Sequence, residues 1–310
     1  MSGLAYVTGP TVATSVDVNS VAVVGPGAIG TTVAAALYES GAAPRLYGRT
    51  ARARLELRAD GEHVIVPGPV DTDPAAVTHP ADIVFLAVKS TQIDAAAGWL
   101  STLCHPETVV CVLQNGVEQV AMVTPLVAGC PVVPSVVWFP AQTQPDGSVW
   151  LRGAARLTLP DSSASQIVAE ALRGSRCAVE LDADFTSVAW RKLLQNAVAG
   201  LMALSGRRAG VFRRDDIAAL SLSYLHECLA VARAEGATLG DTVPQEIVDS
   251  FRAYPTDMGT SILADREAGR PLEWRIRNDV IARRGREHGI PTPISDVVTP
   301  LLAAVSDGPG

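Results

Sequence analysis

A short glycine motif near the N-terminus constrains the fold of this chain more than any other feature. Gly25-Pro26-Gly27-Ala28-Ile29-Gly30 follows a β-branched run at residues 18–24 and precedes a helix-forming stretch at 31–40. The first glycine of such a motif permits a tight turn, the second lets the backbone approach a pyrophosphate, and the third lets helix and strand pack closely. Free N–H groups at the helix N-terminus favour an anion. The motif therefore predicts a dinucleotide-binding unit.

The rest of the first half alternates between apolar strands and helices. We expect strands at 45–47, 64–66, 83–88, 108–113 and 179–181, helices at 93–103 and 162–174, and several short strands between 132 and 159. Continuous apolar runs such as 83–88 and 108–113 are typical of parallel strands that are buried on both faces. Together with the glycine motif, this pattern predicts an α/β Rossmann fold.

Helical periodicity replaces this alternation after about residue 184. It predicts helices at 185–204, 214–235, 244–253, 260–268 and 272–288. A chain of 310 residues is long enough for about two domains. We therefore divide it into an N-terminal extension at 1–17, a Rossmann dinucleotide-binding domain at 18–183 and an all-helical domain at 184–310.

The composition excludes several other classes of protein. A net charge of -7 disfavours nucleic-acid binding, which depends on clustered Lys and Arg. The scattered cysteines and histidines form no pair at metal-ligand spacing, so neither a metal site nor a disulfide framework is expected. We see no signal peptide, and no apolar run approaches the ~18 residues of a membrane span. We expect a cytoplasmic protein that acts on a small molecule.

The end of the second strand indicates which nicotinamide nucleotide is bound. An NAD site has an acidic residue there, which holds the ribose hydroxyls. Here Arg49, Arg52 and Arg54 follow Tyr47-Gly48, and no carboxylate is present to repel a 2′-phosphate. Arg49 is placed to bind that phosphate, which favours NADP. Arg52 and Arg54 are equally consistent with a solvated helix face.

Two polar residues stand where neighbouring strands end. Lys89 follows the run at 83–88, and Asn115 follows the run at 108–113. Ligands of parallel sheets bind at the carboxyl ends of the strands, so both side chains are candidates to reach a cofactor or a substrate. Asn115-Gly116 is also consistent with an ordinary turn.

Lys192 is the strongest catalytic candidate. Only Lys89 and Lys192 of the 25 basic residues are lysines, and arginine cannot donate a proton near neutral pH. Lys192 shares one face of an apolar helix with Asn196, and Gly200 extends that face with a small residue. Desolvation in apolar surroundings lowers the pKa of a lysine, which makes it a general acid near neutral pH. A surface lysine that extends to solvent is the alternative.

Several motifs, in order along the chain, resemble the ketopantoate reductase (2-dehydropantoate 2-reductase) family. They are the glycine motif at 25–30, Ala87-Val88-Lys89-Ser90, Leu113-Gln114-Asn115-Gly116-Val117, Trp190-Arg191-Lys192-Leu193-Leu194-Gln195-Asn196, the stretch from Ser261 to Glu273, and 286–293. They span nearly the whole chain after residue 17. Ser261 and Glu273 attract attention only through this resemblance, because both are ordinary residues for a helix start.

The resemblance implies hydride transfer from NADPH to the carbonyl of a 2-oxo acid, in a cleft between the two domains. The expected substrate is 2-dehydropantoate (ketopantoate), and Lys192 would be the general acid that protonates the developing alkoxide. Arg49 would hold the 2′-phosphate of the cofactor. The family often forms homodimers through the helical domain, so the resemblance implies that 184–310 is the substrate and dimerisation domain.

The resemblance also assigns roles to the other candidate residues. Asn115 would orient the nicotinamide ribose and the substrate, and Lys89 would lie beside the cofactor. Asn196 and Ser261 would bind polar groups of the substrate, and Glu273 would bind the substrate hydroxyl or steady Lys192.

Three positions depart from the family pattern. Gly200 stands where the family usually has a second Asn, Arg275 where it often has an acid, and Asp279 where it often has Gly. We expect Gly200 to leave extra space beside Lys192, which would suit a bulkier or less hydroxylated 2-oxo acid, or an imine. A third hypothesis is a non-enzymatic NADP-binding sensor. Such a sensor would not require Lys192 and Asn196 on a helix face of small residues, so their presence argues against it.

Overall fold

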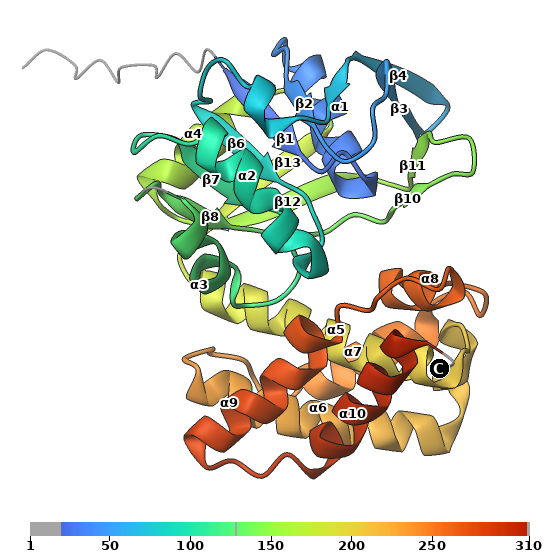
Figure 1. Ribbon diagram of the computed structural model, residues 1–310. Coiled ribbons are helices and arrows are strands. Elements are labelled where there is room, and N and C mark those ends of the chain that lie inside the picture. Colours follow the sequence, from blue (N-terminus) through green and yellow to red (C-terminus); the bar gives the residue numbers. More distant parts are fainter. Residues whose placement is uncertain (1–19, 128, 309–310) are drawn as a thin grey trace, which may run out of the picture.

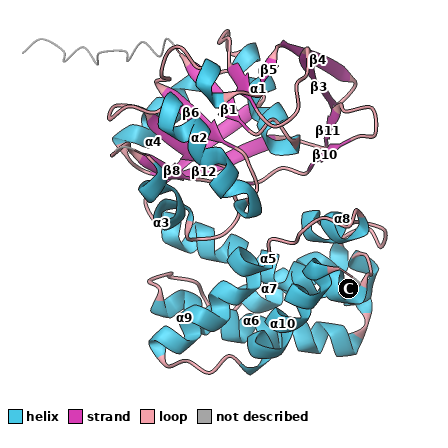
Figure 2. Ribbon diagram, in the orientation of Figure 1, coloured by secondary structure: helices cyan, strands magenta, loops and turns pink. Residues whose placement is uncertain are grey.

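The computed structural model describes residues 20–127 and 129–308, and the predicted extension at 1–17 lies outside them. An α/β part built from the first half of the chain lies against a helical part built from the second half (Figure 1). Among the described residues, strands are confined to the first part, as the colouring in Figure 2 shows. The last strand, β13 (Cys177–Asp182), ends just before the long helix α5 (Phe185–Ser205).

A six-stranded sheet forms the centre of the α/β part. Its strands lie in the order β5-β2-β1-β6-β7-β8, and every neighbouring pair is parallel. The strands are β1 (Val21–Val24), β2 (Arg45–Tyr47), β5 (Val70–Asp71), β6 (Ile83–Leu86), β7 (Val109–Val112) and β8 (Val132–Pro134). The order reverses between β1 and β6, which is where ligands of such sheets bind. The predicted Rossmann fold is confirmed.

Helices cover both faces of this sheet, which explains the continuous apolar strands. Val23 and Phe85 pack with helix α1 (Ala28–Glu39) in one cluster, whereas their neighbours Val24 and Leu86 pack with α2 (Ile93–Leu103) in another. Successive residues of a strand point to opposite faces, so a strand between two helical layers is apolar at every position. The shorter helices of this part are α3 (Gln119–Val123), α4 (Ser163–Ala171), η1 (Pro74–Ala76), η2 (Ser90–Gln92) and η3 (Thr124–Leu126).

Two smaller sheets flank the central one. One has the order β10-β11-β3-β4 and the other the order β13-β12-β9. Their remaining strands are β3 (Arg54–Ala59), β4 (Glu62–Pro67), β9 (Val136–Val137), β10 (Ala141–Thr143), β11 (Val149–Leu151) and β12 (Ala155–Pro160). The interpretation that Arg52 and Arg54 lie on a solvated helix face is therefore wrong. Arg54 begins β3, which pairs antiparallel with β4, and Arg52 lies in the preceding loop.

Helix α5 forms the centre of the helical part. It packs against α6 (Asp215–Ala234), α8 (Ser261–Glu267) and α10 (Pro293–Asp307), and its apolar residues lie in one cluster with theirs. The remaining elements are η4 (Ala209–Arg213), α7 (Val243–Ala253), the π-helical turn η5 (Arg275–Asp279) and α9 (Val280–His288). No helix in the described part of the chain has the length and apolar character that a membrane span requires.

Two features of the helical part differ from the sequence prediction. The helix expected at 272–288 begins only at Trp274 and passes through the π-helical turn before α9, so Glu273 precedes the helix instead of lying in its first turn. Helix α10 was not predicted at all. It has Pro293 at its first position and a second proline, Pro300, inside it, and prolines in a sequence normally favour loops.

Candidate active site

The glycine motif follows β1 and forms a tight turn into α1. Gly25 has a φ of +88°, and a Cβ there would lie 2.7 Å from Val88 Cγ1. A Cβ on Gly30 would lie 2.4 Å from the carbonyl oxygen of Gly25, so only glycine lets the helix pack this closely. A Cβ on Gly27 would meet no atom of the described residues within 4 Å, so the backbone at Gly27 borders open space among them.

This turn fits the pyrophosphate of a dinucleotide. Gly27 is the N-cap of α1, no side chain caps the helix there, and its first turn, which starts with Ala28 and Ile29, contains no acidic residue. The first N–H groups of a helix have no acceptor within the helix, and the helix dipole is positive at this end. Pro26 closes the turn against the second strand, since a Cβ on Gly48 would lie 2.9 Å from Pro26 Cδ. An anion placed at Gly27 would meet free donors and no opposing charge.

Arg49 lies next to this turn. The Gly25 N–H donates to the carbonyl of Tyr47, which brings the end of β2 beside the glycine motif. Arg49 follows two residues later and is exposed. Arg54, by contrast, is paired with Glu56 on its own strand at 2.8 Å. The geometry thus separates Arg49 from Arg54 as a candidate for the 2′-phosphate.

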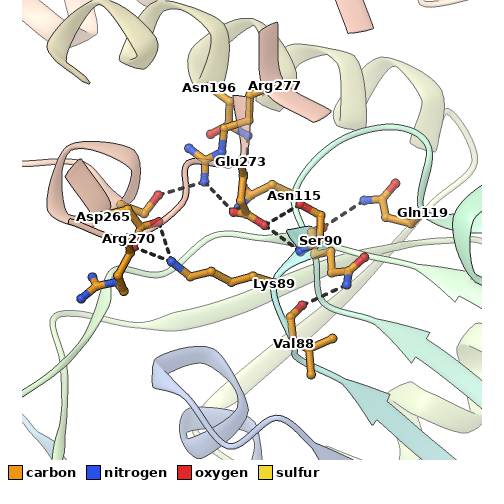
Figure 3. Close-up of polar contacts among 12 residues, drawn as sticks. Val88, Lys89, Ser90, Asn115, Gln119, Asn196, Asp265, Arg270, Glu273 and Arg277 are labelled. Atoms are coloured by element: carbon orange, nitrogen blue, oxygen red, sulfur yellow. Dashed lines mark hydrogen bonds and ion pairs between the residues drawn. The ribbon is translucent and has the colours of Figure 1, made fainter. Parts of the chain in front are cut away.

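Glu273 is the centre of a polar cluster that joins the two parts of the molecule (Figure 3). The backbone N–H and the hydroxyl of Ser90 donate to Glu273 Oε1 at 3.0 and 3.1 Å. Asn115 Nδ2 and Arg277 Nη2 each lie 3.4 Å from Glu273 Oε2. Ser90 and Asn115 follow β6 and β7, so the ends of two parallel strands meet the segment between α8 and η5.

Asn196 and Ser261 extend this cluster at opposite ends. Asn196 Nδ2 donates to Asn115 Oδ1 at 3.3 Å, and Arg277 Nη2 donates to Ser261 Oγ at 3.0 Å. The four residues assigned to the substrate by resemblance, Asn115, Asn196, Ser261 and Glu273, therefore belong to one hydrogen-bonded chain. Arg277, which the sequence analysis did not single out, connects Ser261 to the rest.

Lys89 forms a second contact between the two parts. Its ammonium lies 2.5 Å from both carboxylate oxygens of Asp265, and Arg270 Nε binds the same carboxylate at 2.9 Å. Asp265 is buried, with a side-chain exposure of 5%, whereas Lys89 keeps 37% of its side chain exposed. Lys89 and its neighbour Ser90 thus bind two different segments of the helical part.

Lys192 lies on α5 against an aromatic ring of the α/β part. Its ammonium is 4.7 Å from the centre of the Trp138 ring, a distance at which a cation and a ring attract each other. Desolvation is the main reason that the pKa of Lys192 falls to about 8, and the positive charges of Arg277 and Arg156 lower it further. A lysine with such a pKa can donate a proton near neutral pH.

Glu273 carries the opposite charge in the same site. Burial alone would raise the pKa of its carboxyl, but the charge of Arg277, the hydrogen bonds from Ser90 and the charge of Lys89 outweigh that effect. The pKa therefore lies below its ordinary value, and Glu273 is ionised at neutral pH. An ionised carboxylate accepts hydrogen bonds and donates none.

The extra space expected at Gly200 is not present. A Cβ on Gly200 would lie 2.8 Å from Nδ2 of Asn278 and 3.1 Å from Leu302 Cδ1, so these two side chains occupy that position. Asn278 is fully buried and donates to the carbonyl of Ala197 and to the hydroxyl of Tyr224. The prediction of a wider pocket at Gly200 was wrong because an asparagine from η5 fills the space.

The other two departures also lie away from the polar cluster. Arg275 is exposed and stacks over the Trp274 ring at 5.3 Å. Asp279 binds Arg283 of the next turn at 3.0 Å. Among the described residues, no group of three or more His, Cys, Asp or Glu side chains could hold a metal ion.

Sequence reasoning missed Ser90, Trp138, Asp265 and Arg277. Ser90 had a signal, because it stands next to Lys89 at a strand end. Trp138 and Asp265 had none, because each gains its role by meeting a residue of the other part of the molecule. Arg277 carries a charge in a segment that was expected to be an ordinary helix, where a solvated arginine is the default interpretation.

Comparison with known proteins is consistent with this geometry. The family model for ketopantoate reductase PanE/ApbA matches residues 21–164, and the model for its C-terminal part matches 184–306. The chain is 59% identical to a 2-dehydropantoate 2-reductase of Mycobacterium tuberculosis, an alignment that covers 94% of this chain and 99% of the relative. A relative with the same description from Caulobacter vibrioides is 35% identical, with 93% and 99% coverage.

The same fold is present in solved structures. A dimeric ketopantoate reductase from Staphylococcus aureus superimposes with a TM-score of 0.85 at 28% identity, over 94% of this chain and 100% of that one. One family model matches the α/β part and the other the helical part, and both relatives align across the two. The chain belongs to the ketopantoate reductase PanE/ApbA family.

Proposed function

We propose that this enzyme reduces 2-dehydropantoate to pantoate, with NADPH as the hydride donor. The observation that carries the proposal is the hydrogen-bonded chain from Asn196 through Asn115, Glu273 and Arg277 to Ser261. It is built from both parts of the molecule and lies at the sheet edge that carries the glycine motif. The description of the M. tuberculosis relative supports the same reaction.

Lys192 is the proton donor in this mechanism. A nicotinamide cofactor held at the glycine motif would supply the hydride for the carbonyl carbon, and negative charge would develop on the carbonyl oxygen. The Lys192 ammonium stabilises that charge and transfers a proton to the oxygen. A pKa of about 8 keeps Lys192 mostly protonated at neutral pH and still makes it a better acid than an ordinary lysine.

The polar chain orients the substrate. Glu273 is ionised and accepts a hydrogen bond from a substrate hydroxyl, while the amides of Asn115 and Asn196 can both donate and accept. Ser90 and Arg277 fix the carboxylate of Glu273, so it need not reorganise when the substrate binds. Because Asn278 closes off Gly200, the site has no extra space there for a bulkier substrate.

Arg49 supports NADP as the preferred cofactor. It is exposed beside the glycine motif, and a guanidinium binds a 2′-phosphate well. We expect the Kd for NADPH to be about tenfold or more below that for NADH, since the phosphate adds one charge-assisted contact. Arg49→Met should reduce that preference, whereas Arg54→Met should leave it unchanged because Arg54 is paired on β3.

Lys192→Met tests the mechanism. We expect loss of NADPH oxidation by about 10²–10⁴-fold, which is the usual contribution of a general acid, with NADPH binding retained. Arg191→Met is the matched control, because Arg191 is the neighbouring cation and pairs with Glu246 at the surface. Equal activity of the Lys192 variant and the control would refute the assignment. Rates of NADPH oxidation with ketopantoate and with a panel of other 2-oxo acids, ketones and cyclic imines show which of them is the preferred substrate.

The helical part has a surface that suits a homodimer. An apolar groove of about 530 Å³ lies between α5, α6 and α10, and Leu220, Val297 and Leu301 remain 38%, 60% and 51% exposed at its edge. The S. aureus relative is described as dimeric. We expect Val297→Glu to shift the mass in solution from dimer to monomer. Ile65→Glu on β4 is the control. Ile65 is likewise an exposed apolar residue, at 42%, but it belongs to the α/β part and not to this groove.

A further inference from the structure

Arg277 is a buried charged residue of the site whose hydrogen-bond donors are not all paired among the described residues. Its side chain is only 2% exposed, although arginine is among the residue types least often buried. Nη2 donates to Ser261 Oγ at 3.0 Å and lies 3.4 Å from Glu273 Oε2. Nε is buried and has no acceptor within the part of the chain that the structure describes.

A buried guanidinium with a free N–H needs another acceptor. Glu273 satisfies it only in part, because the same carboxylate also accepts from Ser90 and Asn115. Leaving a buried charged donor unpaired costs free energy, and the natural complement of a guanidinium is a second carboxylate, which can accept two parallel N–H bonds. Arg277 therefore requires an anionic acceptor, and the place for that acceptor is next to Ser261.

The surrounding charges also favour an anion. Lys192 and Arg277 are both cations, and Glu273 pairs with Arg277 at 3.4 Å. Asp265 is already shared between Lys89 and Arg270. The described ionised groups that line the cluster thus leave a net positive charge, and a bound carboxylate would reduce it.

We propose that Arg277, together with Ser261, binds the carboxylate of the 2-oxo acid and so selects acids over uncharged ketones and esters. This inference rests on the proposed function, because it assigns the part of the substrate that Lys192 does not contact. A 2-oxo acid carries its carboxylate and carbonyl on adjacent carbons. An anion site close to the proton donor therefore fits this substrate class, and Arg277 is near enough to influence Lys192 electrostatically.

A purely structural role for Arg277 makes a different prediction. If Arg277 only holds Glu273 in place, its loss should affect every carbonyl substrate equally. If it binds the substrate carboxylate, its loss should affect only charged substrates strongly. The ratio of kcat/KM for an acid to that for its methyl ester separates these roles, because the ester lacks the charge but keeps the carbonyl.

The experiment uses the full chain with 3-methyl-2-oxobutanoate and its methyl ester. For Arg277→Met we expect kcat/KM to fall about a hundredfold with the acid and less than about tenfold with the ester, as expected for loss of hydrogen bonds to a charged group. The control is Arg275→Met, which removes an exposed arginine from the same π-helical turn. Equal losses for acid and ester in the Arg277 variant would overturn the proposal.

A conservative variant keeps the proposal testable if Arg277→Met does not fold. Arg277→Lys retains the charge but not the planar pair of donors, so we expect the acid-to-ester ratio to fall by about tenfold. An unchanged ratio in that variant would also overturn the proposal. A wild-type protein that binds NADPH but reduces no 2-oxo acid would instead refute the proposed function, so the two failures are distinguishable.

Discussion

Replacing Gly30 with alanine should destabilise the protein, although alanine is the better helix former. Within a helix, Gly→Ala ordinarily stabilises by up to about 1 kcal/mol. At Gly30, however, the new Cβ would lie 2.4 Å from the carbonyl oxygen of Gly25 and 3.0 Å from Ala87 Cβ. The first of these atoms belongs to the backbone and cannot rotate away. Helix α1 would have to move away from the turn that follows β1.

The size of the effect follows from these opposing contributions. Overpacking a well-packed region costs about 1–3 kcal/mol, and a contact this short lies at the upper end of that range. After the gain in helix propensity, we expect a net loss of about 1–2 kcal/mol in the free energy of unfolding. For a domain of this size, that loss corresponds to a decrease in Tm of about 2–8 °C.

Gly27→Ala provides the matched control, since both variants add one methyl group to the same turn. Within the part of the chain that the structure describes, a Cβ at Gly27 meets no atom within 4 Å, so the free energy of unfolding should change by less than about 1 kcal/mol. That methyl would occupy the space that a pyrophosphate approaches, so the Kd for NADPH should rise about tenfold or more. Urea unfolding and NADPH titration measure both quantities. A Gly30 variant as stable as the wild type would refute the packing argument.

Three further predictions concern Lys192, the contact between Lys89 and Asp265, and Gly200. Turnover should fall as pH rises through about 8, because protonated Lys192 is then lost; a rate that stays constant to about pH 9.5 would point to another proton donor. Asp265→Asn should lower the free energy of unfolding by about 1–2 kcal/mol, measured by urea unfolding, since it leaves Lys89 without its carboxylate; an unchanged value would mean that this pair adds nothing in solution. Gly200→Ala should cost about 1–3 kcal/mol through its contact with Asn278, whereas unchanged stability with an altered KM would place this position at the substrate.

The central sheet could be predicted because burial on both faces leaves a direct record in the sequence. Ile83–Leu86 and Val109–Val112 are apolar at every position, and turn residues follow each run. Strand β3 (Arg54–Ala59) was missed although its residues alternate between exposed or partly exposed and buried positions. Its arginines suggested a solvated helix, and the alternation is short. The period of two was the signal that should have decided the matter.

The contacts of the candidate site were less accessible to sequence reasoning. The glycine motif is local, so its geometry follows from neighbouring residues. Ser90 and Glu273 are 183 positions apart, and their hydrogen bond depends on how the two parts of the molecule pack. Asn278 filling the space at Gly200 is likewise a contact between distant segments. A motif can indicate which residue types are present, but it does not show which side chain occupies a given volume.

The segment after β6 limits where the chain can tolerate insertions and deletions. Three consecutive residues there contact three different segments: Val88 packs against Gly25, Lys89 binds Asp265, and the N–H and hydroxyl of Ser90 bind Glu273. Surface loops usually accept changes in length, because few of their atoms have fixed partners. Here a single added or removed residue would shift all three contacts at once. The length of this segment, which leads from β6 into the short helix η2, should therefore vary far less than that of an ordinary surface loop.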